Sequence, residues 1–312
     1  MSTTIDSTYQ SVIARLPPDL REPARGLLFE LGLARAPEAG WADVFQLVPS
    51  RDLPLLAPPA DSPCEERTLD AFRRAHHGAC FYNVLVDRMA DRQAATTPER
   101  ERLAEHFLEY WRWSLAEADG DGRHTAWAID RGIRTWRRGV ELERAALARH
   151  SLRLGRYGRG ILLKLGWAGI ASECLLRHQV EAHRVRLFRR AFSLLASGMQ
   201  CVDDAADSAE DEAVHGLGFP AALGFPPAAL FTAGALLTRA AASAAARGRF
   251  DRFAEWLSHR ASELERIRER RIRPEDNLAG MVIASSLEAV CLSVCGPTRE
   301  DVVGITSSAS ST

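Results

Sequence analysis

The segment of the sequence best suited to chemistry is an acidic stretch at residues 199–212. Six carboxylic acids fall there, whereas residues 191–238 contain no lysine or arginine. On an α-helix with about 3.6 residues per turn, Asp203, Asp207 and Asp211 would share one face, where their like charges repel. Hard oxygen ligands on one face suit Mg²⁺ bridging to a phosphate. The spacing therefore predicts a magnesium site. The alternative is a solvated helix face balanced by arginines from elsewhere in the chain.

A second acidic pair lies earlier in the chain. Asp87 and Asp91 are four residues apart and end an apolar run that begins at Phe81. Such a pair alone is weak evidence, because Arg88 or Arg92 could satisfy both carboxylates at the surface. Together with the acidic stretch, however, the pair predicts two acidic helix ends that face one another across a cavity and hold metal ions between them.

Arginines are concentrated between these two acidic segments. Residues 131–159 contain nine of them, and Arg156 and Arg159 lie in a glycine-rich stretch. The planar guanidinium group binds phosphate oxygens with several donors at once. A nucleic-acid stripe is disfavoured, because 40 basic and 41 acidic residues leave a net charge of −1. We expect most of these arginines to be solvated and one or two to reach a phosphate site.

The elements that must position these residues are predicted to be helices. Nine of the fifteen prolines fall within residues 17–63, and none lies between Glu99 and Phe219. Apolar residues recur at spacings of three and four, which indicates an all-α protein. Start signals precede two of the helices, at Ser62–Glu65 and Thr96–Glu99. The predicted helices span residues 65–92, 98–118, 124–150, 160–178, 181–214, 227–247, 249–272 and 275–295.

The predicted organisation has three parts. Residues 1–63 form an N-terminal segment with one or two short helices and a proline-rich wrap, residues 64–296 form a helical bundle, and residues 297–312 form a polar tail. Six cysteines without a CxxC pair or a secretory signal indicate a cytoplasmic protein with reduced thiols. No stretch of about 20 apolar residues without a breaker was identified, so we expect no stable membrane insertion.

With these residues in view, the sequence resembles the class I isoprenoid synthases over roughly residues 65–295. This group comprises the trans-prenyl diphosphate synthases, the class I terpene cyclases, and the squalene and phytoene synthases. Residues 199–207 are similar to the second aspartate motif, in which Gln precedes DDxxD. The spacing of Asp203, Asp204, Asp207 and Asp211 is similar to the cyclase form NDxxSxxxE. Residues 200–220 are similar to the squalene and phytoene synthase pattern, with DxxED at Asp207–Asp211 and a following proline at Pro220.

The resemblance implies a single helical bundle around a central pocket, with a prenyl diphosphate and about three Mg²⁺ ions, which Mn²⁺ can replace, at its mouth. It adds Asp204 to the metal ligands Asp87, Asp91, Asp203, Asp207 and Asp211, and it gives Gln200 a place in substrate binding. The pyrophosphate-sensing arginine of the family matches Arg156 or Arg159. Lys164 occupies roughly the place of the lysine that contacts diphosphate in chain-elongating synthases.

Three departures from the family pattern disfavour chain elongation or an ordinary cyclase lid. The first motif reads Asp87-Arg-Met-Ala-Asp91 instead of DDxxD, and no arginine pair follows it. The amino-terminal Gly-Gly-Lys-Arg segment that binds isopentenyl diphosphate is absent. Arg270, Arg271 and Arg273 stand near the C-terminus without the tyrosine of the cyclases' Arg-Tyr pair.

The function that follows is ionisation of an allylic diphosphate, which needs charge neutralisation at the leaving group and no serine or cysteine nucleophile. Aromatic faces would shield the carbocation, and Phe81 and Tyr82 are expected below the metal site, where they would limit chain length. The leading hypothesis is a terpene synthase, a carbon–oxygen lyase, acting on one prenyl diphosphate. The alternatives are a prenyltransferase or head-to-head condensing enzyme, and a non-catalytic helical protein. A homodimer is left open.

Overall fold

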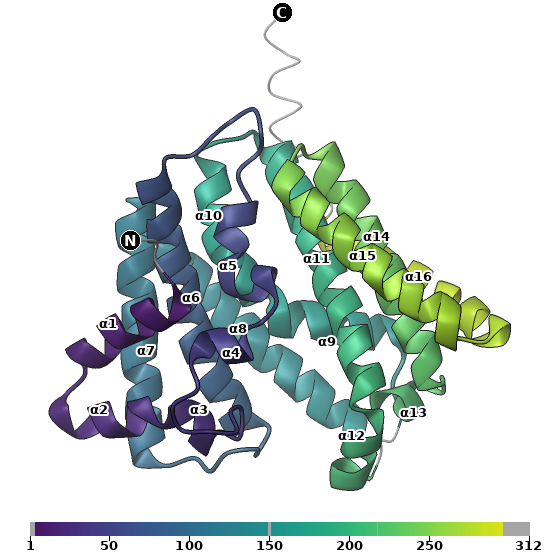
Figure 1. Ribbon diagram of the computed structural model, residues 1–312, viewed down its shortest axis with the longest axis horizontal. Coiled ribbons are helices and arrows are strands. Elements are labelled where there is room, and N and C mark those ends of the chain that lie inside the picture. The colour runs from purple at the N-terminus through teal and green to yellow at the C-terminus, as the bar shows by residue number, and fades with distance from the viewer. Residues whose placement is uncertain (1–3, 149–150, 217, 296–312) are drawn as a thin grey trace, which may run out of the picture. The chain divides into compact units, whose positions relative to one another are not determined.

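The computed structural model describes residues 4–148, 151–216 and 218–295 (Figure 1). Every regular element among these residues is a helix, and none of them forms a strand. This confirms the predicted all-α class. The predicted polar tail at residues 297–312 lies outside the described residues.

The chain folds as two compact units. The first unit comprises Met1–Glu141, Leu163–Glu181 and Arg249–Phe253, and the second comprises Leu142–Leu162, Ala182–Gly248 and Ala254–Thr312. Helices α8 (Gly122–Leu147) and α9 (Leu154–Leu165) each begin in one unit and end in the other. The division expected at residue 63, between an N-terminal segment and a bundle, stays a prediction.

The first unit is built around two long antiparallel neighbours, α6 (Glu66–Ala90) and α7 (Pro98–Asp119). Gly78 lets them approach closely, because a Cβ atom there would lie 2.9 Å from the Tyr110 ring. Thr97 caps α7, one residue after Thr96, the first residue of the predicted capping box, and its hydroxyl oxygen accepts from the Arg100 amide at 3.3 Å. The unit also contains α1 (Ile5–Arg15), α2 (Pro18–Arg25), α3 (Leu27–Glu30), α4 (Trp41–Val44), α5 (Val48–Leu56), the 3-10 helix η1 (Gly166–Gly169) and α10 (Ile170–Arg177).

The N-terminal residues contribute to the core of the first unit. The side chains of Tyr9 and Trp41 are buried against Phe81, with ring centroids 4.9 and 4.7 Å away. Phe107 of α7 completes this aromatic cluster. Residues 5–56 thus form five short helices that are integral to packing, where the sequence suggested one or two.

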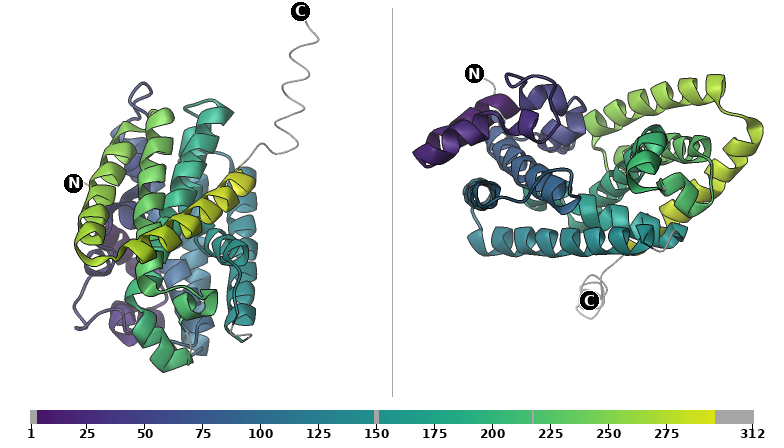
Figure 2. Two further views of the ribbon diagram at one scale, coloured as in Figure 1. Left: turned by 90° about the vertical axis from the view of Figure 1, so that its right-hand side faces the viewer. Right: turned by 90° about the horizontal axis from the view of Figure 1, so that it is seen from below.

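The second unit places α14 (Pro227–Arg247) against α11 (Ala182–Ala206) on one side and α16 (Pro274–Cys295) on another (Figures 1 and 2). Two glycines bring α11 and α14 together, since a Cβ atom on Gly234 would lie 2.6 Å from the carbonyl oxygen of Gly198. This contact fixes α11, the helix that carries the acidic motif. The remaining helices are α12 (Ser208–His215), α13 (Phe219–Leu223) and α15 (Asp251–Arg271), whose first residues belong to the first unit.

Two of the predicted helices are broken in the structure. The helix expected over residues 181–214 ends at Ala206 and resumes at Ser208, because Asp207 has φ −90° and ψ 1°. The helix expected over 160–178 begins earlier, at Leu154, and is divided into α9, η1 and α10. Both breaks lie next to predicted site residues.

Among the described residues, two helices are long and apolar enough to cross a membrane by length and composition. In α14 the apolar window is 67% buried, as expected for a core helix, whereas in α16 it is 28% buried and leaves Leu278, Met281 and Val282 exposed. The sequence reasoning missed the apolar stretch of α16, in which Glu288 is the one charged residue after Asp276.

Candidate functional site

The acidic motif occupies the C-terminal end of α11 in the second unit. Asp203 and Asp207 are exposed, and the Asp207 amide donates to the Asp203 carbonyl oxygen at 2.9 Å. This bond keeps the spacing of one helical turn, so the two carboxylates remain neighbours on the same side. Asp211 lies one turn further, in α12, and its side chain is outside what the structure describes. Asp203 and Asp207 therefore form a solvent-facing pair of carboxylates.

Asp204 has a different environment from its neighbours. Successive residues point about 100° apart around a helix, so Asp204 faces the interior while Asp203 faces solvent. Its side chain accepts a hydrogen bond from the Tyr157 hydroxyl at 2.5 Å and another from Gln200 Nε2 at 2.7 Å. A metal ion at Asp204 would have to displace one of these donors. The Gln200 side chain, which we expected to contact substrate, therefore donates its hydrogen bond to Asp204.

Burial raises the pKa of Asp204 to about 7, although the bonds from Tyr157 and Gln200 act in the opposite direction. The folded protein therefore binds a proton here that the unfolded chain releases near pH 4. At low pH the proton on Asp204 therefore stabilises the fold. As the pH rises toward 7, this contribution to the free energy of unfolding decreases by up to about 1.4 kcal/mol per pH unit.

We expect this pH dependence to disappear in Asp204→Asn, because an amide does not titrate. Denaturant unfolding of both proteins between pH 4 and 8 measures the difference. The stability of the wild type relative to Asp204→Asn should fall as the pH rises from 4 to about 7 and then level off. A difference that stays constant with pH would show that Asp204 does not carry the shifted pKa.

The second acidic pair is held by a lysine. Asp87 lies in the last turn of α6 and Asp91 caps it. Lys164 Nζ lies 3.8 Å from an Asp87 oxygen and 3.6 Å from an Asp91 oxygen, and Trp136 Nε1 donates to Asp87 at 3.2 Å. Burial and the nearby Asp91 charge raise the pKa of Asp87, while Lys164 and Trp136 oppose that shift. Lys164, expected to contact diphosphate, here neutralises the first motif.

The two candidate clamp arginines lie three residues apart on α9. Arg156 and Arg159 are both exposed, whereas Tyr157 between them is buried. Residues three apart share one face of a helix, so both guanidinium groups can reach the same solvent-facing site. Their contact with diphosphate stays a prediction.

The predicted pocket-wall residues are placed in the core of the first unit. Phe81 is fully buried among Tyr9, Trp41 and Phe107, and its role in the pocket wall stays a prediction. Tyr82 is 6% exposed and its ring centroid lies 6.1 Å from that of Trp111. A role for Tyr82 in setting chain length stays a prediction.

The carboxylate oxygens of the acidic residues are of the ligand type that Mg²⁺ prefers. Within the described part of the chain, no group of three or more His, Cys, Asp or Glu side chains is arranged to hold a metal ion. Mg²⁺ commonly binds one or two carboxylates and completes its octahedral shell with water and substrate phosphate oxygens. The exposed pair Asp203 and Asp207 fits that requirement, and the pair Asp87 and Asp91 fits it once Lys164 moves aside.

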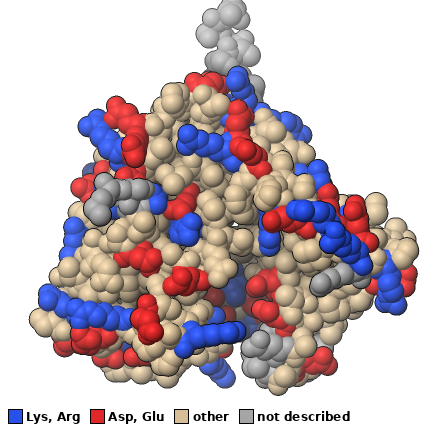
Figure 3. Space-filling view, in the orientation of Figure 1, with Lys and Arg blue, Asp and Glu red and all other residues tan. Residues whose placement is uncertain are grey.

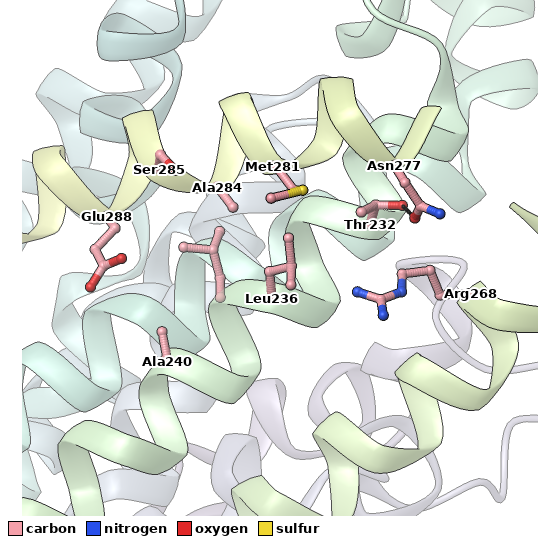
Figure 4. Close-up of a pocket in the computed structure, with 10 residues that line it drawn as sticks. Thr232, Leu236, Ala240, Arg268, Asn277, Met281, Ala284, Ser285 and Glu288 are labelled. Carbon is pink, nitrogen blue, oxygen red and sulfur yellow. Dashed lines mark hydrogen bonds between the residues drawn. The ribbon is translucent and has the colours of Figure 1, made fainter. Parts of the chain in front are cut away.

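A cavity of about 430 Å³ lies in the second unit between α14, α15 and α16 (Figure 4). Leu236, Met281 and Ala284 give it apolar walls, and Arg268 and Glu288 lie at its margins. No residue predicted for the site lines it. On the face in Figure 3, acidic and basic side chains are interspersed instead of gathering into a patch of one sign.

Sequence reasoning missed two residues that contact the acidic motifs. Tyr157 bonds to Asp204, which is 47 residues away in the chain, and Trp136 bonds to Asp87, which is 49 residues away. The one available signal was the position of Tyr157 between two candidate arginines. Neither partnership can be read from local spacing.

A comparison with solved structures matches the chain to the crystal structure of polyprenyl synthetase from Streptomyces coelicolor A3(2). The match covers 92% of this chain and 96% of that chain, with 13% sequence identity and a TM-score of 0.51. No protein-family profile and no curated protein sequence matches the chain. At this identity the likeness shows the fold: the chain has the all-helical isoprenoid synthase fold, as the motifs predicted.

Proposed function

We propose that this protein is a class I terpene synthase, which ionises one linear prenyl diphosphate, rearranges or cyclises the carbocation and releases diphosphate. The observation that carries the proposal is the exposed pair Asp203 and Asp207 at the end of α11, within an isoprenoid synthase fold. Two carboxylates one helical turn apart offer the oxygen ligands that Mg²⁺ prefers.

Each group in the proposed site has a distinct task. Asp203 and Asp207 would hold Mg²⁺, and when bound, the metal would neutralise charge on the departing diphosphate. Arg156 and Arg159 would donate hydrogen bonds to diphosphate oxygens. In the first unit, Lys164 supplies a positive charge at Asp87 and Asp91.

A prenyltransferase of the same fold is the second candidate. The likeness to a polyprenyl synthetase favours it. The missing Gly-Gly-Lys-Arg segment and the shortened first motif, Asp87 to Asp91, disfavour it, because they leave a second substrate without its usual binding groups.

Incubation with geranyl, farnesyl or geranylgeranyl diphosphate and Mg²⁺ distinguishes these functions. A terpene synthase should release diphosphate and a hydrocarbon or alcohol from a single substrate, and chelation of Mg²⁺ should stop the reaction. Release that begins only after isopentenyl diphosphate or another acceptor is added would establish a prenyltransferase. No release with any substrate, in a folded protein, would favour a non-catalytic role.

A further inference from the structure

Tyr157 and Asp204 form the most deeply buried polar contact next to the proposed site. Tyr157 is 4% exposed and Asp204 5%, and their oxygen atoms are 2.5 Å apart. Burying a carboxyl group costs free energy unless hydrogen bonds replace those to water. Here Tyr157 and Gln200 supply them, so the carboxyl group is committed to contacts within the protein.

This contact joins α9 and α11 at the positions where their candidate functional residues lie. Tyr157 follows Arg156 directly and precedes Arg159 by two residues, while Asp204 stands directly after Asp203. The bond therefore fixes the register of the helix with the arginines against the helix with the exposed carboxylates.

Besides this bond, the Tyr157 hydroxyl lies 3.8 Å from Cys201 Sγ of α11, and α9 also makes apolar contacts. Gly158 packs on α16, where a Cβ atom would lie 2.7 Å from Leu287, and the Tyr157 ring centroid lies 5.9 Å from that of Phe219. These contacts are apolar and adapt to small shifts. A hydrogen bond between buried groups tolerates less displacement, because it weakens steeply with distance and angle.

We propose that Tyr157 is a positioning residue, which holds Arg156 and Arg159 of α9 at the distance from Asp203 and Asp207 that a metal-bound diphosphate requires. The proposal rests on the proposed function. It also gives Asp204 the role of holding α9 on α11 instead of the role of a metal ligand. The second aspartate of the motif then acts through Tyr157 and α9 instead of through the metal.

Tyr157→Phe tests the role by removing one hydroxyl group while keeping the ring against Phe219. Tyr9→Phe is the matched control, because Tyr9 is also buried and its hydroxyl donates to the Ala24 carbonyl oxygen at 2.6 Å, in the first unit. Two measurements are made on each folded protein: amide hydrogen exchange over residues 154–165 without ligand, and calorimetric binding of inorganic diphosphate in the presence of Mg²⁺.

In Tyr157→Phe we expect faster exchange in α9 and diphosphate binding weakened about tenfold, as small misplacements of binding groups are costly. Tyr9→Phe should change neither. Should Tyr157→Phe fail to fold, Asp204→Ala removes the acceptor of the same bond. Combining the two substitutions should weaken binding no further than either alone.

Unchanged diphosphate binding in Tyr157→Phe would overturn the positioning role. Additive effects of the two substitutions would equally overturn it, because the residues would then act separately. If the wild-type protein itself binds no diphosphate, the proposed function is wrong and the positioning role falls with it. Amide hydrogen exchange in α9 then still shows whether the Tyr157–Asp204 bond holds α9 on α11.

Discussion

Asp207→Asn is expected to lower the rate of diphosphate release by about two to four orders of magnitude, because several kcal/mol of charge stabilisation at the leaving group depend on the metal. Removing one charge from the exposed pair should also raise the Mg²⁺ concentration needed for half-maximal activity. A solvated helix face predicts the opposite, since relieving repulsion between Asp203 and Asp207 should stabilise α11 slightly and leave activity unchanged.

Diphosphate release measured against Mg²⁺ concentration separates the two interpretations. Asp130→Asn serves as the control, because Asp130 is an exposed aspartate on α8 whose ion pair with Arg112 lies at the surface. Such pairs contribute about 0–1 kcal/mol, so this variant should keep wild-type turnover and metal dependence. Wild-type behaviour in Asp207→Asn would contradict metal binding by the pair.

Local sequence signals predicted most of the helices. The helix expected over 98–118 is α7 (Pro98–Asp119), and the one expected over 227–247 is α14 (Pro227–Arg247). Proline in the first turn, apolar spacing and a Thr97 cap act within a few residues, so they are readable from the chain. The Ser62 signal failed because the Ser62 hydroxyl donates to the distant Gln179 carbonyl oxygen, and α6 starts at Glu66 without a side-chain cap.

The candidate site was only partly predictable, because its details depend on tertiary partners. Spacing predicted that Asp203 and Asp207 share one side of the helix, and in the structure the Asp207 amide bonds to the Asp203 carbonyl oxygen one turn earlier. It could not reveal that Asp204 turns inward to Tyr157, nor that Lys164 lies between Asp87 and Asp91. These contacts join residues from different helices, and helical periodicity carries no information about which helices are neighbours.

A buried charge network in the first unit also escaped the sequence reasoning. Asp52 of α5 accepts hydrogen bonds from Arg73 of α6 and from Arg51, both at 2.7 Å, and His77 Nε2 lies 3.7 Å away. Burial alone would raise the pKa of Asp52, but the approach of His77 and the charges of Arg51 and Arg73 hold that pKa well below its usual range. Thr8 of α1 joins the network through His77 Nδ1 at 2.9 Å.

Asp52→Asn is therefore expected to lower the free energy of unfolding by about 3–5 kcal/mol, because it leaves the buried Arg73 guanidinium without its main countercharge. Asp70→Asn is the matched control. Asp70 also contacts Arg73, but at 3.3 Å and with 21% of its side chain exposed, so its loss should cost about 1 kcal/mol or less. Denaturant unfolding of the three proteins at neutral pH measures both values.

The network matters for the proposed site because it fastens α1 and α5 to α6, the helix that ends in Asp87. Arg73 and His77 lie in the first half of α6. Loss of their contacts with Asp52 should therefore loosen the part of α6 that precedes Asp87. Asp52→Asn should then lose activity at a lower denaturant concentration than Asp70→Asn, in step with its loss of stability. Equal stability of the two variants would show that the buried ion pair does not hold the N-terminal helices in place.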